Sequence, residues 1–305
     1  MEFSVLLLTA PTEKIAAVYL EQLQALRSTL PALKSCKIYC VADPSGVRIG
    51  SGGGTLNALD FLRQQGVDVS TEKILLIHSG GDSRRAPFYS LCGKAWITLN
   101  ATVGGADTSP AQSTLLANPL SVLIEELSRF ATNLGPESLM VASSDVLLDL
   151  TGHYGECPSE FARDAVTVVS VPEDPRIATN HGVLVRGNDT GDRYNTTDAD
   201  ADQYTSQLAG DYLQKPSVEE MYRKNACYSS ITGATATVAA AGTQDFAMID
   251  TGVVIFTGRA LQTFVGLAAD PIVSMCTKRR LQQLQQLQDK VGPSQSAISA
   301  LRFEL

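Results

Sequence analysis

The sequence predicts an α/β protein with a mainly parallel, mixed central sheet flanked by helices. Three observations indicate this class. Short apolar runs alternate with helical patterns, which is typical of βαβ units. The composition, 44% hydrophobic and 18% charged, is that of an ordinary globular protein. A chain of 305 residues is also long enough to bury a core without disulfide bonds.

The first half of the predicted sheet is read from three apolar runs. VLLLT (5–9), KIYCVA (37–42) and KILLIH (73–78) are each short enough to be buried strands. Helical patterns separate them, at about 13–30 and 55–65. We therefore expect the three strands to be parallel neighbours.

The second half continues with further strands. A helix near 120–132 leads to SLMVASSDVLL (138–148), followed by AVTVVSVP (165–172) and GVLVRG (182–187). The first two of these runs are so apolar that we expect burial on both faces. Polar or small residues at 187–211 and 229–244 predict hairpin ends or loops, and 279–290 predicts a helix with leucines on one side.

Charge and cysteine usage exclude several classes of protein. The net charge of −8 argues against binding to nucleic acid or to an anionic membrane surface. No apolar stretch approaches the ~18 residues of a membrane span, and Glu2 stands where a signal peptide would carry basic residues. Six scattered cysteines without zinc-site spacing predict reduced core thiols in a cytoplasmic protein.

Two glycine-rich segments follow the second and third predicted strands. The first, RIGSGGGT (48–55), includes Gly52, Gly53 and Gly54 and opens a helix, where free backbone amides favour phosphate. The alternative is a tight turn capped by Thr55. Four glycines within five residues exceed the needs of a cap, which favours nucleotide contact.

The second segment combines glycines with basic side chains. In GGDSRRAP (80–87), backbone donors accompany the planar fork of Arg85, and Lys94 follows as a mobile point charge. Isolated basic residues in loops are usually only solvated, but this grouping suits a triphosphate. The Walker motif fails because Ala95 follows Lys94, and no nucleophile elbow or zinc-protease motif occurs.

Three single residues also deserve mention. Asp145 follows an apolar strand and can hold Mg²⁺ between phosphate oxygens, the alternative being a helix cap or turn aspartate. His78 ends a strand and is more simply interpreted as a packed, hydrogen-bonded residue than as a base. His181 precedes a strand, where a role in positioning substrate is open.

The run from Gly80 through Ser83, Arg85 and Pro87 to Lys94 resembles the signature of sugar-1-phosphate nucleotidyltransferases. Further segments resemble the pyrophosphorylase half of bifunctional L-fucokinase/GDP-L-fucose pyrophosphorylases, from about residue 3 to 265. These segments are DPSGVRIGSGGGTLNAL (43–59), KILLIHSGGDSRRAPFYSLCGK (73–94), ATNHGVLV (178–185), DYLQKPSVEEM (211–221) and MIDTGVVIFTGRAL (248–261).

That resemblance implies a Rossmann-like nucleotide-diphospho-sugar transferase fold over 1–265, with a C-terminal helical extension over 266–305 leading to further domains. It implies the reaction of GTP with L-fucose 1-phosphate to give GDP-L-fucose and pyrophosphate. It also implies residue roles. The nucleotide would contact Gly52, Gly53, Gly54, Gly80, Gly81, Ser83 and Arg85; Lys94 would neutralise the triphosphate, Asp145 would carry Mg²⁺, Lys215 would meet the sugar phosphate, and Gly182, Asp250 and Thr251 would line the sugar pocket.

The sequence departs from the resembled families in two respects. The second metal-ligating acid of the superfamily cannot be placed, and no phosphate loop of the linked kinase occurs, so we expect no kinase activity from this chain. There are two alternatives to this function. The chain could be a non-catalytic nucleotide-binding module of a sugar kinase, or a pyrophosphorylase for a related sugar such as D-arabinose 1-phosphate. An NAD-dependent oxidoreductase rests only on an incomplete glycine fingerprint, in which Thr55 replaces the third glycine.

Overall fold

A computed structural model describes residues 3–79, 93–99, 117–150, 165–187, 209–229 and 245–270. The chain divides into two compact units, Met1–Thr167 with Val254–Leu305, and Val168–Val253. Strand β9 (Asp245–Thr257) contributes to both units, and so does β5 (Val166–Glu173). This division was not predicted from the sequence.

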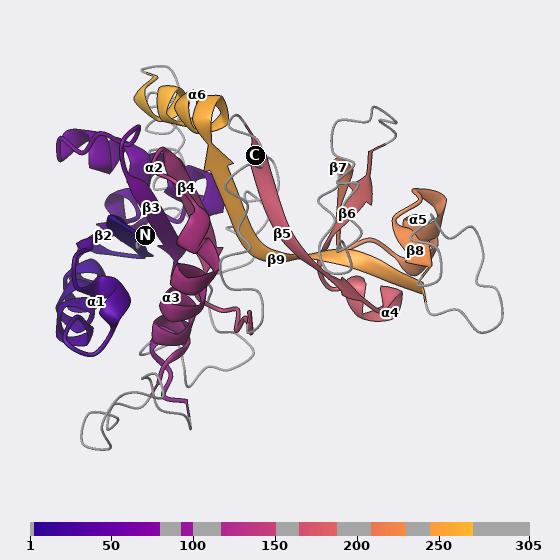
Figure 1. The fold of residues 1–305 in the computed structure, drawn as a ribbon, viewed down its shortest axis with the longest axis horizontal. Coiled ribbons are helices and arrows are strands. Elements are labelled where there is room, and N and C mark those ends of the chain that lie inside the picture. Colours follow the sequence, from indigo (N-terminus) through magenta and orange to yellow (C-terminus); the bar gives the residue numbers. More distant parts are fainter. Residues whose placement is uncertain are drawn as a thin grey trace, which may run out of the picture. The chain divides into compact units, whose positions relative to one another are not determined.

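The first unit contains the predicted parallel sheet (Figure 1). Strands β1 (Val5–Ala10), β2 (Lys37–Ala42), β3 (Lys73–His78) and β4 (Ser138–Ser143) are parallel in the order β2-β1-β3-β4, and the end of β9 pairs antiparallel with β4. The sheet is thus mixed but mostly parallel, as predicted.

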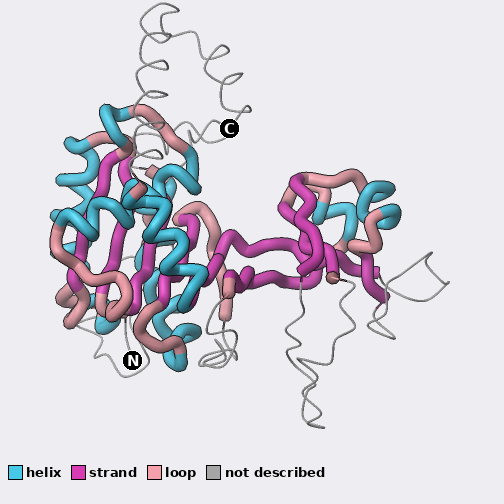
Figure 2. Tube along the Cα trace, turned by 90° about the horizontal axis from the view of Figure 1, so that it is seen from above, coloured by secondary structure: helices cyan, strands magenta, loops and turns pink. Residues whose placement is uncertain are grey.

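Helices cover both faces of this sheet (Figure 2). Helices α2 (Gly50–Gln64) and α6 (Gly258–Ala269) lie on one side, and α1 (Glu13–Leu26) and α3 (Pro119–Phe130) on the other (Figure 1). Alternate residues of β1 point to opposite faces, and both Leu7 and Leu8 are fully buried. Leu7 belongs to the core cluster that includes Leu59 of α2 and Leu261 of α6.

Short elements connect these layers. The 3₁₀ turns η1 (Pro31–Leu33), η2 (Pro44–Gly46), η4 (Lys94–Trp96) and η5 (Ala131–Asn133) lie between the larger elements of the first unit. Helix α1 ends four residues before the predicted boundary at residue 30, because Leu26 is followed by a turn leading into η1. Among the described residues, no helix is long and apolar enough to cross a bilayer.

The second unit is an antiparallel sheet with helices on one face. Strand β6 (Gly182–Arg186) pairs with β7 (Ala209–Gln214) and with β9, which also pairs with β5 and β8 (Cys227–Ser229). Helices α4 (Pro175–Ala178) and α5 (Val218–Arg223) cover Val183, Leu213 and Ile249. Most of the predicted hairpin ends or loops at 187–211 and 229–244 lies outside the described residues, but the strands that flank them, β6 with β7 and β8 with β9, are antiparallel pairs.

Two predictions about burial have different outcomes. Strand β4 is largely buried, as expected, whereas β5 is not: Val166 and Val171 are 53% and 40% exposed. The apolar composition of β5 therefore does not signal burial on both faces. Cys36 and Cys227 are buried free thiols and Cys40 is half-buried and free, which agrees with the prediction for these three cysteines.

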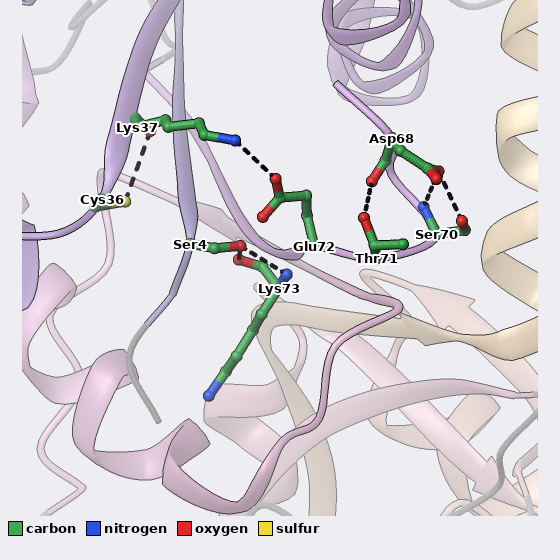
Figure 3. Close-up of polar contacts among 8 residues, drawn as sticks. All are labelled: Ser4, Cys36, Lys37, Asp68, Ser70, Thr71, Glu72 and Lys73. Carbon is green, nitrogen blue, oxygen red and sulfur yellow. Dashed lines mark hydrogen bonds and ion pairs between the residues drawn. The ribbon is translucent and has the colours of Figure 1, made fainter. Parts of the chain in front are cut away.

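The amino-terminal edge of the parallel sheet has polar contacts of its own (Figure 3). Lys37, at the start of β2, donates to Glu72 at 2.9 Å, and Ser70 donates to Asp68 at 2.6 Å. The Lys73 ammonium is buried, donates to the carbonyl of Ala131 and lies 5.0 Å from the centre of the Phe3 ring. These contacts lie at the edge opposite to the predicted nucleotide site.

Candidate nucleotide and sugar-phosphate site

The carboxyl edge of the parallel sheet brings predicted site residues together. Strands β1, β3 and β4 end there at neighbouring positions, with Leu8 beside Ile77 and His78 beside Ser143. Ligands of open α/β sheets bind outside the carboxyl ends of the strands. This edge is therefore the candidate site of the first unit.

Lys94 and Asp145 form an ion pair at this edge. The Lys94 Nζ lies 3.1 Å from Asp145 Oδ2, and the Ser143 hydroxyl donates to Asp145 Oδ1 at 2.6 Å. Burial alone would raise the pKa of Asp145, but the Ser143 and Lys94 hydrogen bonds outweigh it and hold that pKa below its usual value. Asp145 is thus a carboxylate at neutral pH, with both side chains about one-third exposed.

Packing against α1 positions Lys94. Gly93, immediately before it, has a φ of +76°, and a Cβ at this position would come within 2.6 Å of the Tyr19 hydroxyl. The Tyr19 and Trp96 rings lie 5.5 Å apart between centroids. A glycine is needed at 93 because its backbone is left-handed and in close contact with a buried tyrosine. This anchors η4, and with it Lys94.

The first glycine-rich segment is helical, which corrects the sequence prediction. Helix α2 begins at Gly50, so Gly52, Gly53 and Gly54 belong to its first turns, and no side chain caps it. Thr55 is not the cap, since its hydroxyl donates to the carbonyl of Ser51 at 2.9 Å. A Cβ on Gly52 would meet nothing within 4 Å, so its surroundings are open. Uncapped amides beside open space suit a phosphate.

His78 contacts both β1 and α2. Its Nε2 lies 3.0 Å from Thr55 Oγ1 and its Nδ1 3.4 Å from Thr9 Oγ1. A Cβ on Gly54 would lie 3.2 Å from His78 Cε1, so the helix approaches the ring closely. Burial lowers the pKa of His78 to about 4, and the ring is neutral at pH 7. The interpretation of His78 as a packed, hydrogen-bonded residue is confirmed.

The second unit holds the predicted sugar-pocket residues around Gly182. The Tyr212 hydroxyl donates to Asp250 Oδ2, and this pair occupies the space that a Cβ on Gly182 would need. The other oxygen of Asp250 accepts from the Gly252 amide at 3.1 Å. These groups lie on the face of the β9-β6-β7 sheet opposite to α4 and α5. Thr251 does not join them, because its side chain is buried and donates to the carbonyl of Val169 at 2.8 Å.

Lys215 follows β7 in a left-handed conformation, with φ of +49°. Its amide donates to the carbonyl of His181 at 3.0 Å, which ties the two ends of the β6–β7 pair, and its side chain is exposed. Gly80, Gly81, Ser83 and Arg85 lie outside the described residues.

Sequence reasoning missed three contributors to these sites. Thr9 and Ser143 are short polar residues at strand ends, and Tyr212 lies on an exposed strand. Each gains its role from a partner distant in sequence or from a neighbouring loop, so no local pattern marks it. Ser143 carried the only usable signal, because it precedes Asp145 by two residues, a common spacing for hydroxyl-to-carboxylate contacts.

The described residues around Asp145 fit Mg²⁺ to a limited degree. Mg²⁺ is commonly held by one or two carboxylates together with substrate phosphates, so a single ionised aspartate beside a lysine is compatible with it. Within the described ranges, no group of three or more potential ligand side chains gathers at one point. The metal would thus depend on the nucleotide for most of its ligands.

The mostly parallel sheet, helical on both faces and bearing charged groups at its carboxyl edge, is an α/β fold consistent with the Rossmann-like class. Residues 67–298 match the model of the fucose pyrophosphorylase domain, and the chain belongs to this family. The resemblance predicted from the sequence is confirmed.

Three similar proteins agree with this assignment. The chain is 29% identical to an Arabidopsis thaliana protein named bifunctional fucokinase/GDP-fucose pyrophosphorylase, over 86% of this chain and 24% of that protein. It is 32% identical to human fucose-1-phosphate guanylyltransferase, over 73% of this chain and 34% of the human one. It is 30% identical to a Bacteroides fragilis protein named L-fucokinase/L-fucose-1-P guanylyltransferase, over 60% of this chain and 18% of that protein. The chain therefore spans about a fifth to a third of the length of these relatives.

Proposed function

We propose that this chain transfers the guanylyl group of GTP to L-fucose 1-phosphate, giving GDP-L-fucose and pyrophosphate. The observation that carries the proposal is the Lys94–Asp145 pair, 3.1 Å apart at the carboxyl edge of the sheet in a member of the fucose pyrophosphorylase domain family. The names of the relatives support the choice of substrates.

The chemistry requires charge stabilisation more than a base. The attacking oxygen belongs to a sugar phosphate that is already ionised at neutral pH, so no side chain has to remove a proton from it. The barrier is repulsion between two polyanions, which cations and oriented amides reduce in the in-line transition state at the α-phosphorus. Lys94 and the uncapped first turn of α2 supply such groups.

Asp145 has the properties of a ligand for a hard cation. Its pKa lies below the usual value, so it is charged throughout the neutral range. We propose that it would hold Mg²⁺, which when bound would neutralise part of the charge of the phosphates. Lys94 forms an ion pair with Asp145 in this structure. With Mg²⁺ on Asp145, the Lys94 ammonium would instead contact the triphosphate.

In the second unit, the proposal assigns the sugar phosphate to Lys215 and the sugar to the face around Gly182. Lys215 is exposed, and Asp250 and Tyr212 offer a carboxylate and an aromatic hydroxyl beside Gly182. Thr251 would not contact the sugar, because its hydroxyl donates to the carbonyl of Val169. Its contribution would be to hold the strand next to Asp250 in place.

The test is pyrophosphate release with each of four nucleoside triphosphates and several sugar 1-phosphates, including D-arabinose 1-phosphate. We expect GTP with L-fucose 1-phosphate to be preferred and turnover to require Mg²⁺. Product formation with no pair of substrates, while GTP still binds, would instead identify a non-catalytic nucleotide-binding module.

Lys94→Ala gives a sharper version of this test. We expect turnover to fall ~10²- to 10³-fold, the usual effect of removing one charge-stabilising contact. Lys37→Ala is the matched control, because Lys37 also pairs with a carboxylate, Glu72, at 2.9 Å, but at the opposite edge of the sheet (Figure 3). Near-normal turnover by Lys94→Ala would remove this residue from the mechanism.

A further inference from the structure

His78 is the one histidine at the carboxyl edge among the described residues, and the proposed chemistry gives it no role. It contacts the ends of three elements: Thr9 of β1, Thr55 of α2 and, through its carbonyl, the Ser144 amide that follows β4, at 3.0 Å. A half-buried polar ring in such a position holds its neighbours in a fixed geometry, provided its hydrogen bonds are consistent with one another.

The hydrogen-bond directions can be worked out from the donors. The Thr55 hydroxyl has a single hydrogen, which it gives to the carbonyl of Ser51. Thr55 Oγ1 therefore accepts from His78 Nε2, so the hydrogen of the neutral ring is on Nε2. His78 Nδ1 is then an acceptor, and the Thr9 hydroxyl is its donor.

The chain of bonds continues from Thr9 to Ser79. The Ser79 amide donates to Thr9 Oγ1 at 3.2 Å, and the Ser79 hydroxyl donates to the Thr9 carbonyl. Ser79 directly precedes Gly80 in the sequence. Every donor in this chain has one acceptor, from the residue before Gly80 to the carbonyl of Ser51 in the first turn of α2.

We propose that His78 is a positioning residue that fixes the first turn of α2 relative to the carboxyl ends of β1 and β3, so that this turn presents its backbone donors to the nucleotide. This inference rests on the proposed function and deepens it. Gly54 is part of the same arrangement, because a Cβ at this position would lie only 3.2 Å from His78 Cε1 and would push the ring and α2 slightly apart.

The proposal predicts a specific kinetic signature. The first turn of α2, which His78 holds, would contact the nucleotide before and during reaction, so disturbing this turn should weaken GTP binding more than it lowers kcat. A merely structural role would instead lower the melting temperature and the active fraction while leaving the KM for GTP unchanged. The KM for L-fucose 1-phosphate should stay at the wild-type value in either case.

The first variant is Thr55→Val, which keeps the shape of the side chain and removes the acceptor of His78 Nε2. We expect the Kd and KM for GTP to rise roughly three- to tenfold, as for one lost hydrogen bond, with kcat within about twofold of wild type. Thr263→Val is the matched control, because Thr263 makes the same bond to the helix backbone in α6, to Arg259 at 2.8 Å, without a histidine.

The second pair of variants changes the ring itself. His78→Leu should raise the Kd for GTP by roughly ten- to a hundredfold, since both hydrogen bonds are lost. His78→Gln, whose amide can still donate toward Thr55, should recover part of the affinity. Binding is measured by titration calorimetry with GTP and Mg²⁺ in the absence of the sugar phosphate, so no turnover occurs.

The outcomes separate this inference from the proposed function. Thr55→Val with the same Kd and KM for GTP as Thr263→Val would overturn the inference, as would a loss of stability without a change in affinity. Wild-type protein that binds GTP but forms no GDP-fucose would refute the proposed function alone, since the affinities of the variants would still decide the role of His78. Wild-type protein that binds no GTP would refute both.

Discussion

Asp145 is a residue at which burial and hydrogen bonding act in opposite directions. Burial raises its pKa, while Ser143 and Lys94 lower it below the usual aspartate value. Because the folded-state pKa is depressed, the stabilisation provided by this carboxylate is present above the unfolded-state pKa and is lost as the pH falls through the folded-state pKa. Asp145 is therefore fully ionised wherever the proposed reaction is measured near neutral pH.

We predict that Ser143→Ala raises the pKa of Asp145, because it removes one of the two contacts that oppose burial. The stabilisation by this carboxylate should then be smaller at neutral pH, and its loss on acidification should be complete at a higher pH. Carbon-detected NMR titration of the carboxyl groups measures the shift directly. Ser70→Ala is the matched control, since Ser70 donates to Asp68 Oδ1 at the same 2.6 Å at the opposite edge (Figure 3). An unchanged Asp145 pKa in Ser143→Ala would show that the hydroxyl is unimportant for its charge.

Gly182 has a role that its sequence context does not reveal. Gly182 is the first residue of β6, and its missing side chain makes room for the Tyr212–Asp250 hydrogen bond. Burial and the nearby Asp250 raise the pKa of Tyr212, so its hydroxyl stays protonated and keeps donating. The sequence could place Asp250 near a sugar only through resemblance, because its partner is 38 residues away.

We predict that Gly182→Ala displaces this pair and raises the KM for L-fucose 1-phosphate roughly tenfold, about the effect of one hydrogen bond to a charged group. The KM for GTP should not change. Tyr212→Phe should have a similar effect without crowding the backbone. Initial-rate kinetics with each substrate varied in turn measures both, and a wild-type KM in Tyr212→Phe would show that the pair does not orient the sugar phosphate.

At the scale of elements, the strands were the most predictable part of the fold. The runs at 5–9, 37–42 and 73–78 are strands within one residue of their predicted limits, because buried parallel strands need continuous apolar sequence. The predicted start of α2, at about residue 55, was wrong, because glycine has a low helix propensity and the prediction therefore left the glycines outside the helix. The helix nevertheless begins at Gly50, and Gly54 in its early turns lies close to the His78 ring.

The glycines of α2 thus weaken the helix while leaving space at its first turn. We predict that Gly52→Ala stabilises the protein by about 0.5 kcal/mol, because alanine has the higher helix propensity and its Cβ meets nothing within 4 Å. It should nevertheless raise the KM for GTP, because the methyl group occupies space intended for phosphate.

Gly266→Ala is the matched control for this prediction. Gly266 lies inside α6, also with nothing within 4 Å of its Cβ position, so its replacement should stabilise the protein without changing the KM for GTP. Denaturant unfolding and initial rates on the same preparations give both quantities. Equal GTP kinetics in the two variants would mean that the first turn of α2 does not contact the nucleotide.

At the scale of the whole molecule, the structure contains two compact units, whereas the domain limits of 1–265 and 266–305 stay a prediction. Strand β9, of 13 residues, belongs to both units of one continuous sheet, because its carboxyl end pairs with β4 and its first half pairs with β6. Gly252, with a φ of +75°, lies inside this strand next to the boundary between the units, but a single glycine in an apolar run does not by itself predict such a change from the sequence. The predicted burial of β5 on both faces was wrong because an apolar composition does not determine which elements will pack against a strand.

The relation to longer, bifunctional relatives leads to a prediction about the activity of this chain alone. It matches the pyrophosphorylase domain over 67–298 and covers 24% of a plant relative whose name also includes fucokinase. The sequence contains no phosphate loop of that kinase class. We therefore expect no L-fucose 1-phosphate to form from L-fucose and ATP. Adding L-fucose 1-phosphate with GTP should restore GDP-L-fucose formation in the same sample, followed by chromatography of the nucleotides. GDP-L-fucose appearing from free L-fucose, ATP and GTP would show that a phosphoryl-transfer site exists within these 305 residues.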